Sequence, residues 1–262
     1  MKHNIIQHTS FWDDKKHLPF DTRLMTLLLL TACGGGGGGG SGDRPLEVSL
    51  ASVRVSRTGN EVEGTGQNDF IYINSSNSEP LNADDGDDFI EGSVSSDLVY
   101  GDKGNDLIHG HSGHDTLHGG QGDDVIIGGH GIDFLYGNQG NDVIFGGDGN
   151  DYIYGGAGND YIDGGSGMDT LTGGAGVDIF AFYYDEVSID ADIITDFEVG
   201  IDRLEFVEGF ETDERYFDIV QSGGDTSIYY TQSGQKEIIV TLQGVTDGVS
   251  FDDFLFYYAE VA

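Results

Sequence analysis

The sequence is short of cysteine, of basic residues and of apolar residues, and each shortage excludes something. Cys33 is the single cysteine, so an internal disulfide framework and a multi-cysteine zinc site are excluded. Lys and Arg total 11 against 47 Asp and Glu, which gives a formal net charge of −36. Nucleic acid and anionic membrane are disfavoured as partners, because their phosphates would meet a like-charged surface. The expected partner is a cation that relieves this self-repulsion.

Catalytic motifs are lacking as well. The sequence contains no HExxH zinc motif, no GxSxG nucleophile elbow and no phosphate-binding P-loop. Roughly forty residues separate a glycine run at 34–40 from the first clear repeat, too few for a catalytic domain. We therefore expect no enzymatic activity.

Apolar residues make up only 37% of the 262 positions, and 44 positions are glycine, which is poor material for an ordinary core. Such a composition also fits a disordered acidic chain. Regular spacing decides against disorder, because residues 83–181 form eleven rows of nine without insertion. Column one of the rows is glycine except at Ala83, column four is glycine except at Ser95, and column eight is always apolar.

Column six is aspartate in every row, and we call this set the aspartate ladder. Its members are Asp88, Asp97, Asp106, Asp115, Asp124, Asp133, Asp142, Asp151, Asp160, Asp169 and Asp178. Columns seven to nine predict short strands in which only the column-eight side chain points inward. Two rows then form one coil, and residues eighteen apart stack at about 4.8 Å.

Stacked carboxylates repel one another unless a hard cation lies between successive turns, and carboxylate and carbonyl oxygens are the ligands of calcium. The turn glycines let carbonyl oxygens crowd towards such an ion. The glycines expected at the sites are Gly101, Gly104, Gly119, Gly122, Gly128, Gly131, Gly137, Gly140, Gly146, Gly149, Gly155, Gly158, Gly164, Gly167, Gly173 and Gly176. Six stacked odd rows and five even rows leave at most nine gaps for Ca²⁺. We expect fewer ions, because row two (Ser93, Ser95) and row four (His111) have weaker turns. The alternative is that the aspartates only make hydrogen bonds within the turns.

This GGxGxDxUx pattern, with U a large apolar residue, resembles the RTX, or haemolysin-type calcium-binding, repeat family over about residues 64–257. The resemblance implies an all-β fold, a right-handed parallel β-roll that binds calcium, is disordered without it and folds outside the cell. Residues 64–72 look like a degenerate copy without a strong ion. Residues 192–204 resemble the segment that follows the repeats in serralysin-type exported proteins. That likeness implies a further ion at Asp192, Asp196 or Asp202, unless these residues only form turns.

The flanks of the repeats predict export and capping. Residues 1–33 read as an export signal of the lipoprotein type, with Cys33 as the lipidated residue, and residues 34–43 read as a glycine-rich tether. Residues 44–82 (Val48, Leu50, Val53 and Val55 among them) and 182–262 are expected to be β caps. The second cap should contain a hairpin over 227–242. Residues 251–256 resemble the ends of type I secretion substrates, which implies a different export machine from the signal.

Two sets of rings have open roles. His109, His111, His114, His118 and His130 could bind a transition metal, but we expect solvent-facing histidines, with His109 and His118 on opposite sheets and His111, His114 and His130 in turns. Tyr100, His118, Tyr136 and Tyr154 recur at eighteen-residue steps and predict an outward aromatic stack, flanked by Phe134 and Tyr152. The stack either stabilises the sheet or binds a sugar or another protein.

The predicted function is calcium binding by a secreted or cell-surface module, a scaffold, adhesin or matrix component that folds when calcium binds. Millimolar external calcium suits weak extracellular sites. We expect an outer-membrane lipoprotein or a type I secreted protein, touching the membrane only through a lipid anchor. The alternative is a polysaccharide-acting enzyme or its carbohydrate-binding module, so extracellular polysaccharide and another protein are the candidate partners.

Overall fold

The computed structural model describes residues 56–58, 61–73, 80–183, 191–207, 210, 213–232 and 234–256. These residues form two sheets and contain no α-helix, only two 3-10 turns at Glu214–Tyr216 and Phe251–Asp253. No helix among them is long and apolar enough to cross a membrane. The predicted export signal, tether and lipidation at Cys33 lie outside the described residues and stay predictions, as do the parts of the first cap at Val48, Leu50, Val53 and Val55.

The first sheet has twelve strands. In spatial order they are β1 (Ser56–Thr58), β2 (Glu61–Glu63), β4 (Leu81–Asn82), β6 (Leu98–Lys103), β8 (Thr116–Gln121), β10 (Phe134–Gln139), β12 (Tyr152–Ala157), β14 (Thr170–Ala175), β16 (Asp192–Ile194), β20 (Gln235–Leu242), β19 (Asp225–Gln232) and β18 (Phe217–Ser222). The second sheet has nine. They are β21 (Phe254–Phe256), β17 (Arg203–Phe206), β15 (Ile179–Phe182), β13 (Tyr161–Ser166), β11 (Val143–Asp148), β9 (Val125–His130), β7 (Leu107–Ser112), β5 (Phe89–Glu91) and β3 (Phe70–Tyr72).

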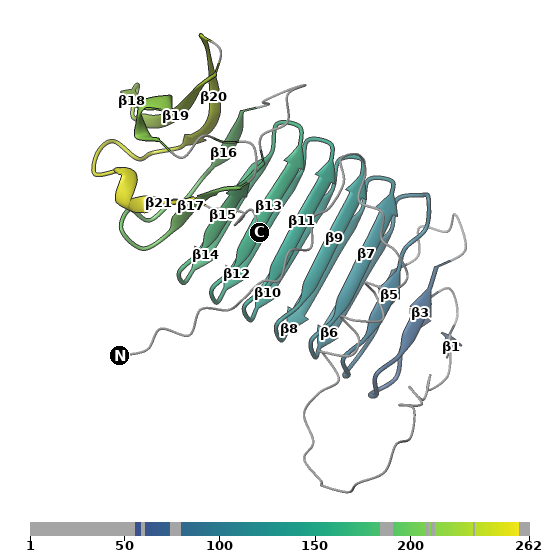
Figure 1. The fold of residues 1–262 in the computed structure, drawn as a ribbon. Helices are drawn as coiled ribbons and strands as arrows, with labels where there is room; N and C mark the ends of the chain where they lie inside the picture. Colours follow the sequence, from purple (N-terminus) through teal and green to yellow (C-terminus); the bar gives the residue numbers. More distant parts are fainter. Residues whose placement is uncertain are drawn as a thin grey trace, which may run out of the picture. The chain divides into compact units, whose positions relative to one another are not determined.

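Successive strands of the repeat alternate between the two sheets, so that each coil takes one strand from each, and the coils stack in parallel (Figure 1). Residues eighteen apart are register partners: Leu135 pairs with Ile153 in one sheet, and Ile144 with Ile162 in the other. The prediction of an all-β parallel β-roll with two rows per coil is therefore confirmed.

The strands are longer than expected. The sequence predicted three residues per strand, but the strands from β6 to β14 have six, running from column seven through column three of the next row. Asn138 in column two, for example, stays in register with Gly156. Parallel pairing continues past the strand into the turn because every coil turns at the same column, so the turn backbone also finds partners eighteen residues away.

The core of the roll is a single file of column-eight side chains. Residues such as Leu117, Ile126 and Leu135 are completely buried, and column one beside them is also buried. Because each strand has only one inward side chain, each coil buries little apolar surface. The core is therefore thin, as predicted, and apolar burial alone offers little to offset chain entropy.

The second cap continues the roll before it changes character. Strand β16 pairs in parallel with β14, and β17 with β15, so one more coil follows the last repeat. The predicted hairpin is confirmed as β19 and β20, which are antiparallel. Here the core widens, because Phe206 packs against Phe217, Phe254 and several other rings. At the other end, β1 and β2 form an antiparallel pair beside β4.

Candidate metal centre

All eleven aspartates of the ladder are buried, with an exposed fraction of 5% or less. A buried carboxylate is costly unless it is hydrogen-bonded or coordinates a cation. Each of the two oxygens of a buried carboxyl group therefore needs a hydrogen-bond donor or a cation as its partner. The two oxygens have different surroundings.

The backbone N–H of every ladder aspartate donates to an aspartate Oδ1 in the next coil. Oδ1 of Asp142 accepts the backbone N–H of Asp124 at 2.8 Å, and the same bond recurs along the whole ladder at 2.7 to 3.1 Å. The acceptor always belongs to the coil that follows in sequence. This bond runs between coils, so it is not the hydrogen bond within a turn that the alternative describes.

The other oxygen, Oδ2, is buried and has no hydrogen-bond partner in most of the ladder. These aspartates are Asp88, Asp106, Asp115, Asp124, Asp133, Asp142, Asp151, Asp160 and Asp178. A buried acceptor without a partner costs about 1–3 kcal/mol, and more when it is charged. A repeated cost of this kind indicates a ligand that the oxygens share.

From Asp106 to Asp178, the space in front of these oxygens is kept open by a column-one glycine, whereas Ala83 occupies column one before Asp88. A Cβ on Gly119 would lie 2.2 Å from Oδ2 of Asp124 and 2.9 Å from the carbonyl oxygen of Gly137, one coil on. At Gly137 the corresponding oxygens belong to Asp142, at 2.3 Å, and Gly155, at 2.4 Å. A carboxylate oxygen and a carbonyl oxygen from the next coil therefore converge on a space that a side chain would fill.

Column-four glycines have a different neighbour. A Cβ on Gly122 would lie 1.8 Å from the carbonyl oxygen of Gly104, one coil earlier, and the φ angle of Gly122 is +132°. These glycines are needed for the left-handed backbone and for close stacking of the coils. The structure thus places the predicted column-one glycines beside the aspartate oxygens and the predicted column-four glycines at the contact between turns.

The donor set fits calcium. Buried carboxylate and carbonyl oxygens are the ligands of a hard cation, and neither thiolate nor imidazole adjoins the spaces beside Gly119 and Gly137. Such an ion would give the second oxygen its missing partner and would neutralise charge between stacked turns.

The charged form of the ladder is unfavourable when no cation is bound. Burial is the largest cause, and it raises the pKa of these carboxyl groups; charged neighbouring aspartates raise the pKa further at many positions. The pKa is about 8 for Asp124 and Asp151, about 7 for Asp88 and Asp115, and about 6 for Asp106, Asp142, Asp160 and Asp178. At neutral pH the ion-free roll therefore either takes up protons or carries buried charge.

Column two decides whether a turn leaves its aspartate oxygen open. Among the described residues, the four non-glycine residues with positive φ are all in column two: Asp84, Asp102, His111 and Asn138, at 70° to 76°. In other rows a glycine has the positive φ at this position. Only row two differs, since Ser93 does not have a positive φ.

Because Ser93 has a different backbone angle, its N–H donates to Oδ2 of Asp97 at 2.7 Å, four residues on. We call this arrangement a self-capped turn. Asp97 therefore has no open oxygen, which agrees with the expectation that row two is weak. Row four keeps an ordinary turn, because His111 adopts the left-handed angle and Oδ2 of Asp115 stays without a partner.

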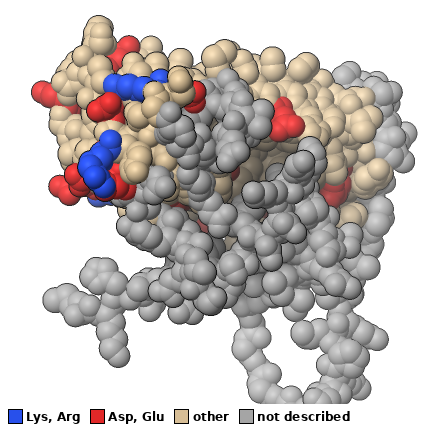
Figure 2. All heavy atoms as spheres, turned by 45° about the horizontal axis from the view of Figure 1, so that its top comes forward, with Lys and Arg blue, Asp and Glu red and all other residues tan. Residues whose placement is uncertain are grey.

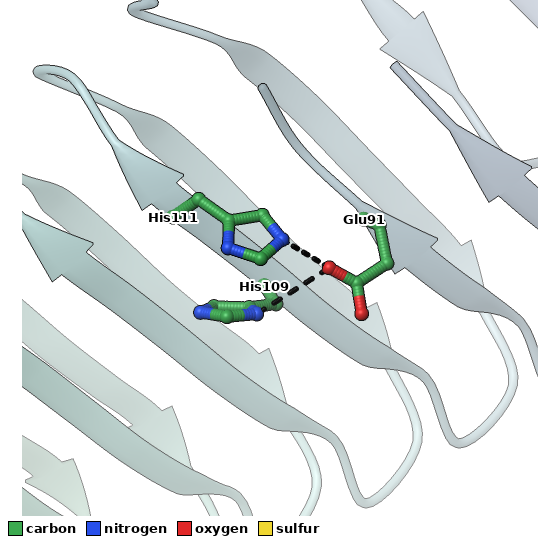
Figure 3. Close-up of side chains that lie close together, drawn as sticks. All are labelled: Glu91, His109 and His111. Carbon is green, nitrogen blue, oxygen red and sulfur yellow. Dashed lines mark hydrogen bonds and ion pairs between the residues drawn. The ribbon is translucent and has the colours of Figure 1, made fainter. Parts of the chain in front are cut away.

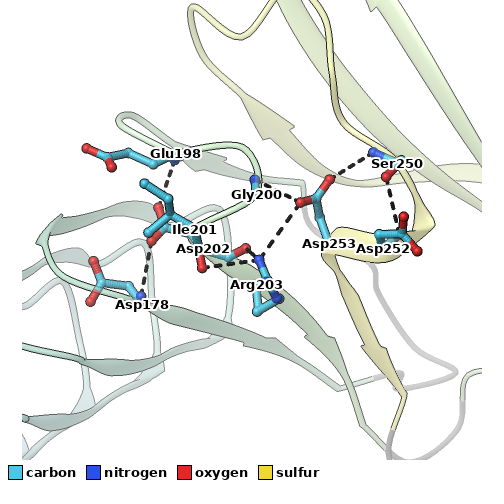
Figure 4. Close-up of polar contacts among 9 residues, drawn as sticks. All are labelled: Asp178, Glu198, Gly200, Ile201, Asp202, Arg203, Ser250, Asp252 and Asp253. Atoms are coloured by element: carbon cyan, nitrogen blue, oxygen red, sulfur yellow. Dashed lines mark hydrogen bonds and ion pairs between the residues drawn. The ribbon is translucent and has the colours of Figure 1, made fainter.

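Two other self-capped turns lie beyond the repeat. Oδ2 of Asp69 accepts the N–H of Thr65 at 2.6 Å, and Oδ2 of Asp202 accepts the N–H of Glu198 at 2.8 Å. Both aspartates still continue the ladder: the N–H of Asp69 donates to Oδ1 of Asp88, and Oδ1 of Asp202 accepts the N–H of Asp178. Figure 4 shows Asp202 between Asp178 and Glu198. The degenerate copy at 64–72 and the segment after the repeats thus supply ladder ends whose second oxygen is already bonded.

The remaining acids of the second cap contact backbone N–H groups as well. Oδ1 of Asp192 accepts the N–H of Asp169 at 2.9 Å. The two oxygens of Asp196 accept from Gly173 and Gly174, at 3.0 and 2.8 Å. A further ion at Asp192, Asp196 or Asp202 stays a prediction. Asp192, in β16, makes the same bond between coils as the ladder aspartates, and Asp196 bonds two backbone N–H groups of the coil before it.

Burial of the ladder hides much of the acidity of the repeat. On the face drawn in Figure 2, most described atoms belong to uncharged residues, and the few Lys and Arg atoms gather at one end beside acidic atoms. The cation–acid pairs in the second cap include Lys236 with Asp218, at 2.9 Å, and Arg215 with Asp213, at 2.6 Å. Surface Lys and Arg therefore pair with surface acids, and the ladder oxygens are left to another cation.

Comparison with known proteins supports this assignment for the repeat. Overlapping segments that together span residues 75–180 match the family described as RTX calcium-binding nonapeptide repeat (4 copies). No curated protein matches the chain.

The similar solved structures include the following three. Two are the R2 and R3 subunits of AlgE6, a mannuronan C5-epimerase from Azotobacter vinelandii, each 27% identical, with TM-scores of 0.32 and 0.26. They cover 52% and 61% of this chain, and 88% and 83% of their own chains. The third is the extracellular lipase LipA from Serratia marcescens, at 19% identity and a TM-score of 0.25, covering 76% of this chain and 40% of that chain.

The family match covers the rows in which the buried oxygens recur, and repeats of this family bind calcium. Residues 75–180 of this chain thus match the family of RTX calcium-binding nonapeptide repeats.

Proposed function

We propose that this chain is an extracellular structural module whose roll folds when calcium binds between its coils. The observation that carries the proposal is the row of buried Oδ2 atoms without partners. From Asp106 to Asp160 each of these oxygens lies close to a column-one glycine and to a carbonyl oxygen of the next coil. The aspartates of the ladder other than Asp97 would hold the ions, with the column-one carbonyl groups as further ligands. This gives fewer ions than the nine gaps allow, because the turn before Asp97 is self-capped.

Coupling between folding and binding follows from the energetics. The single-file core leaves chain entropy poorly offset, and buried carboxylates without a cation oppose folding further. Calcium removes the cost of the buried carboxylates and stabilises the folded state, because it binds the folded coils and not the extended chain. A module of this kind would stay unfolded at cytosolic calcium and fold in the millimolar calcium outside the cell. Its role would be that of a scaffold, adhesin or matrix component without catalytic activity. The signal at 1–33 would direct export of the protein, and a lipid on Cys33 would anchor it.

The test is far-UV circular dichroism of the full chain during a calcium titration, with magnesium as the control cation. We expect a cooperative gain of β signal at about 0.1 to 1 mM calcium and none in magnesium. A chain that shows the same β signal in chelator as in calcium would contradict the proposal. Isothermal titration calorimetry on the same sample gives the number of ions.

A second candidate function rests on the outer face of the first sheet. The rings of Tyr100, His118, Tyr136 and Tyr154 are stacked with centroids 4.5 to 5.2 Å apart, as the sequence predicted. Tyr154 is 40% exposed. Because the rings stack on one another, they offer a row of ring edges and phenol groups, and such a row would bind the hydroxyl groups of an extracellular polysaccharide by hydrogen bonds. Loss of polysaccharide binding in Tyr136→Ala plus Tyr154→Ala, with unchanged calcium-induced β signal, would support it; unchanged binding would leave the stack a purely structural feature.

A further inference from the structure

A cluster of two histidines and one glutamate lies outside the aspartate ladder. Glu91 is at the end of β5, and its register partner in the next coil is His109 on β7. His111 is two residues further along β7, so its side chain is on the same face of the strand as that of His109. Figure 3 shows both imidazoles directed at one oxygen of Glu91. The sequence predicted that His111 and His130 lie in turns and that the histidines face solvent. Instead His111 lies in β7 beside the largely buried His109, and His130 ends β9.

The three side chains bring their donor atoms together. Nδ1 of His109 is 3.5 Å from Oε2 of Glu91, and Nε2 of His111 contacts the same oxygen. All three atoms lie within 4.8 Å of one another. An ion bound at about 2.1 Å in tetrahedral geometry separates its ligands by about 3.4 Å, which is the spacing seen between His109 and Glu91.

The cluster is partly withdrawn from water. The side chains of His109 and Glu91 are only 12% and 16% exposed, while His111 is 39% exposed. Burial acts to raise the pKa of the Glu91 carboxyl group, but hydrogen bonds from His109 and His111 and their charge outweigh it and lower the pKa. Glu91 is therefore an ionised carboxylate at neutral pH, ready to act as a ligand.

From this geometry we infer that Glu91, His109 and His111 form a second class of metal site, one for a divalent transition metal such as Zn²⁺. Imidazole nitrogen is a ligand of zinc and its neighbours, whereas calcium takes oxygen. Three protein ligands leave a fourth position for water.

The position of the cluster gives the site a role. It joins two adjacent coils, because Glu91 belongs to one and both histidines belong to the next. Glu91 directly precedes the self-capped turn of row two, in which Asp97 offers no open oxygen. Zinc would therefore cross-link the coils at the level of the repeat where the calcium series is interrupted.

The column pattern of the repeat supplies well-matched variants. His111→Asn keeps the left-handed backbone, because Asn138 occupies the same column at a φ of 76°. Glu91→Gln keeps the shape of the side chain and removes its charge. The control is His130→Gln, since His130 is also paired with an acid, Asp148, at 2.8 Å, and glutamine occupies its column in the coils with Gln121 and Gln139.

The experiment is a Zn²⁺ titration of the full chain in saturating calcium by calorimetry, with Co²⁺ as a spectroscopic substitute. We expect one zinc bound by the wild type and by His130→Gln, and a four-coordinate visible spectrum with cobalt. Affinity should fall at least about tenfold in Glu91→Gln and in His111→Asn. Calcium-induced circular dichroism of each variant confirms its fold, and if one variant does not fold the other decides.

Two results would overturn the inference. The first is the absence of saturable zinc binding in calcium-saturated wild type, which would make the cluster a hydrogen-bonded triad. The second is equal zinc affinity in wild type, Glu91→Gln and His111→Asn, which would place the ion elsewhere, for example on the aspartates or on other histidines.

Discussion

The turns before Asp97 and Asp124 have the same aspartate at the same column but use its second oxygen differently. In row two the N–H of Ser93 closes the turn on Asp97. In row five Gly120 has a φ of +123°, no hydrogen bond reaches Oδ2 of Asp124, and the oxygen faces Gly119. One backbone angle thus separates a turn that satisfies itself from a turn that needs a cation. The turns with an open Oδ2 therefore destabilise the ion-free roll, and the same turns let calcium stabilise it.

The largest effect is expected when aspartates of open turns are neutralised and the result is compared with neutralisation of Asp97 in the self-capped turn. Asp124→Asn plus Asp142→Asn keeps an acceptor for the hydrogen bond between coils but removes charged ligands, so we expect the calcium midpoint of folding to rise about tenfold or more. Asp97→Asn is the control and should leave the midpoint near the wild-type value. Calcium titration followed by circular dichroism measures both, and equal shifts in the two variants would contradict the distinction.

Acid should partly replace calcium in the turns with open oxygens. The pKa of Asp124 is about 8 in the folded chain without calcium, against about 3.9 in an unfolded chain. Between about pH 4 and 8 the ion-free folded state thus binds more protons than the unfolded state, so its stability falls as pH rises through this window.

We therefore expect more β signal in chelator at pH 5 than at pH 8, and the opposite trend at limiting calcium, because protons compete with the ion. Circular dichroism at several pH values measures both slopes. Asp124→Asn plus Asp142→Asn should flatten the slope in chelator more than Asp97→Asn does. A chelator slope of the opposite sign would show that the carboxyl groups are not buried as described.

Filling one ion space should have a smaller, local effect. A Cβ on Gly119 would meet Oδ2 of Asp124 at 2.2 Å, so Gly119→Ala should destabilise the calcium-bound roll by about 1–3 kcal/mol and lower the ion count by one. Gly66→Ala is the matched control, because its Cβ would have only one neighbour, at 4.0 Å. Thermal unfolding in calcium compares the two, and similar losses in both would refute a specific role for column one.

The finest adjustment converts the self-capped turn into an open one. Ser93→Gly plus Ser95→Gly gives row two the glycines of the other rows and should free Oδ2 of Asp97. We expect one additional calcium by calorimetry and a slight decrease in the calcium midpoint. The control, Ser166→Gly in column three, should change neither quantity. An unchanged ion count in the double variant would show that column two does not control binding.

Much of the roll could be predicted from spacing alone. A period of nine with one inward residue fixes the coil length, the two sheets and the stacking of like residues, and the aromatic stack followed from the same arithmetic. The strand length could not be predicted, because the columns that look like turns by composition continue the parallel pairing. In the sequence, the backbone angle at Ser93 is indicated only by the absence of glycine from that column. The hydrogen bond from Ser93 to Asp97 could be seen only in the structure.

The cluster at Glu91 shows a different limit. Its signal was in the sequence, because Glu91 and His109 are eighteen apart and His111 lies two positions further on. The column pattern of the histidines alone assigns His109 to a strand and His111 to a turn, and it does not include the glutamate. The two residue types converge only when the strand continues through column two, which the expected three-residue strands did not allow.

The bonds between coils also give the roll a polarity. The N–H of each ladder aspartate donates to an aspartate Oδ1 in the coil that follows, and the last two rows of the repeat depend on Asp192 and Asp202 for this acceptor. Removing coils from the amino-terminal end leaves the remaining acceptors in place. Removing them from the carboxy-terminal end strips an acceptor from each newly exposed coil. The two ends of a truncated roll therefore differ in chemistry: the amino-terminal end presents carboxylate oxygens without donors and the carboxy-terminal end presents N–H groups without acceptors, which the second cap supplies in the intact chain.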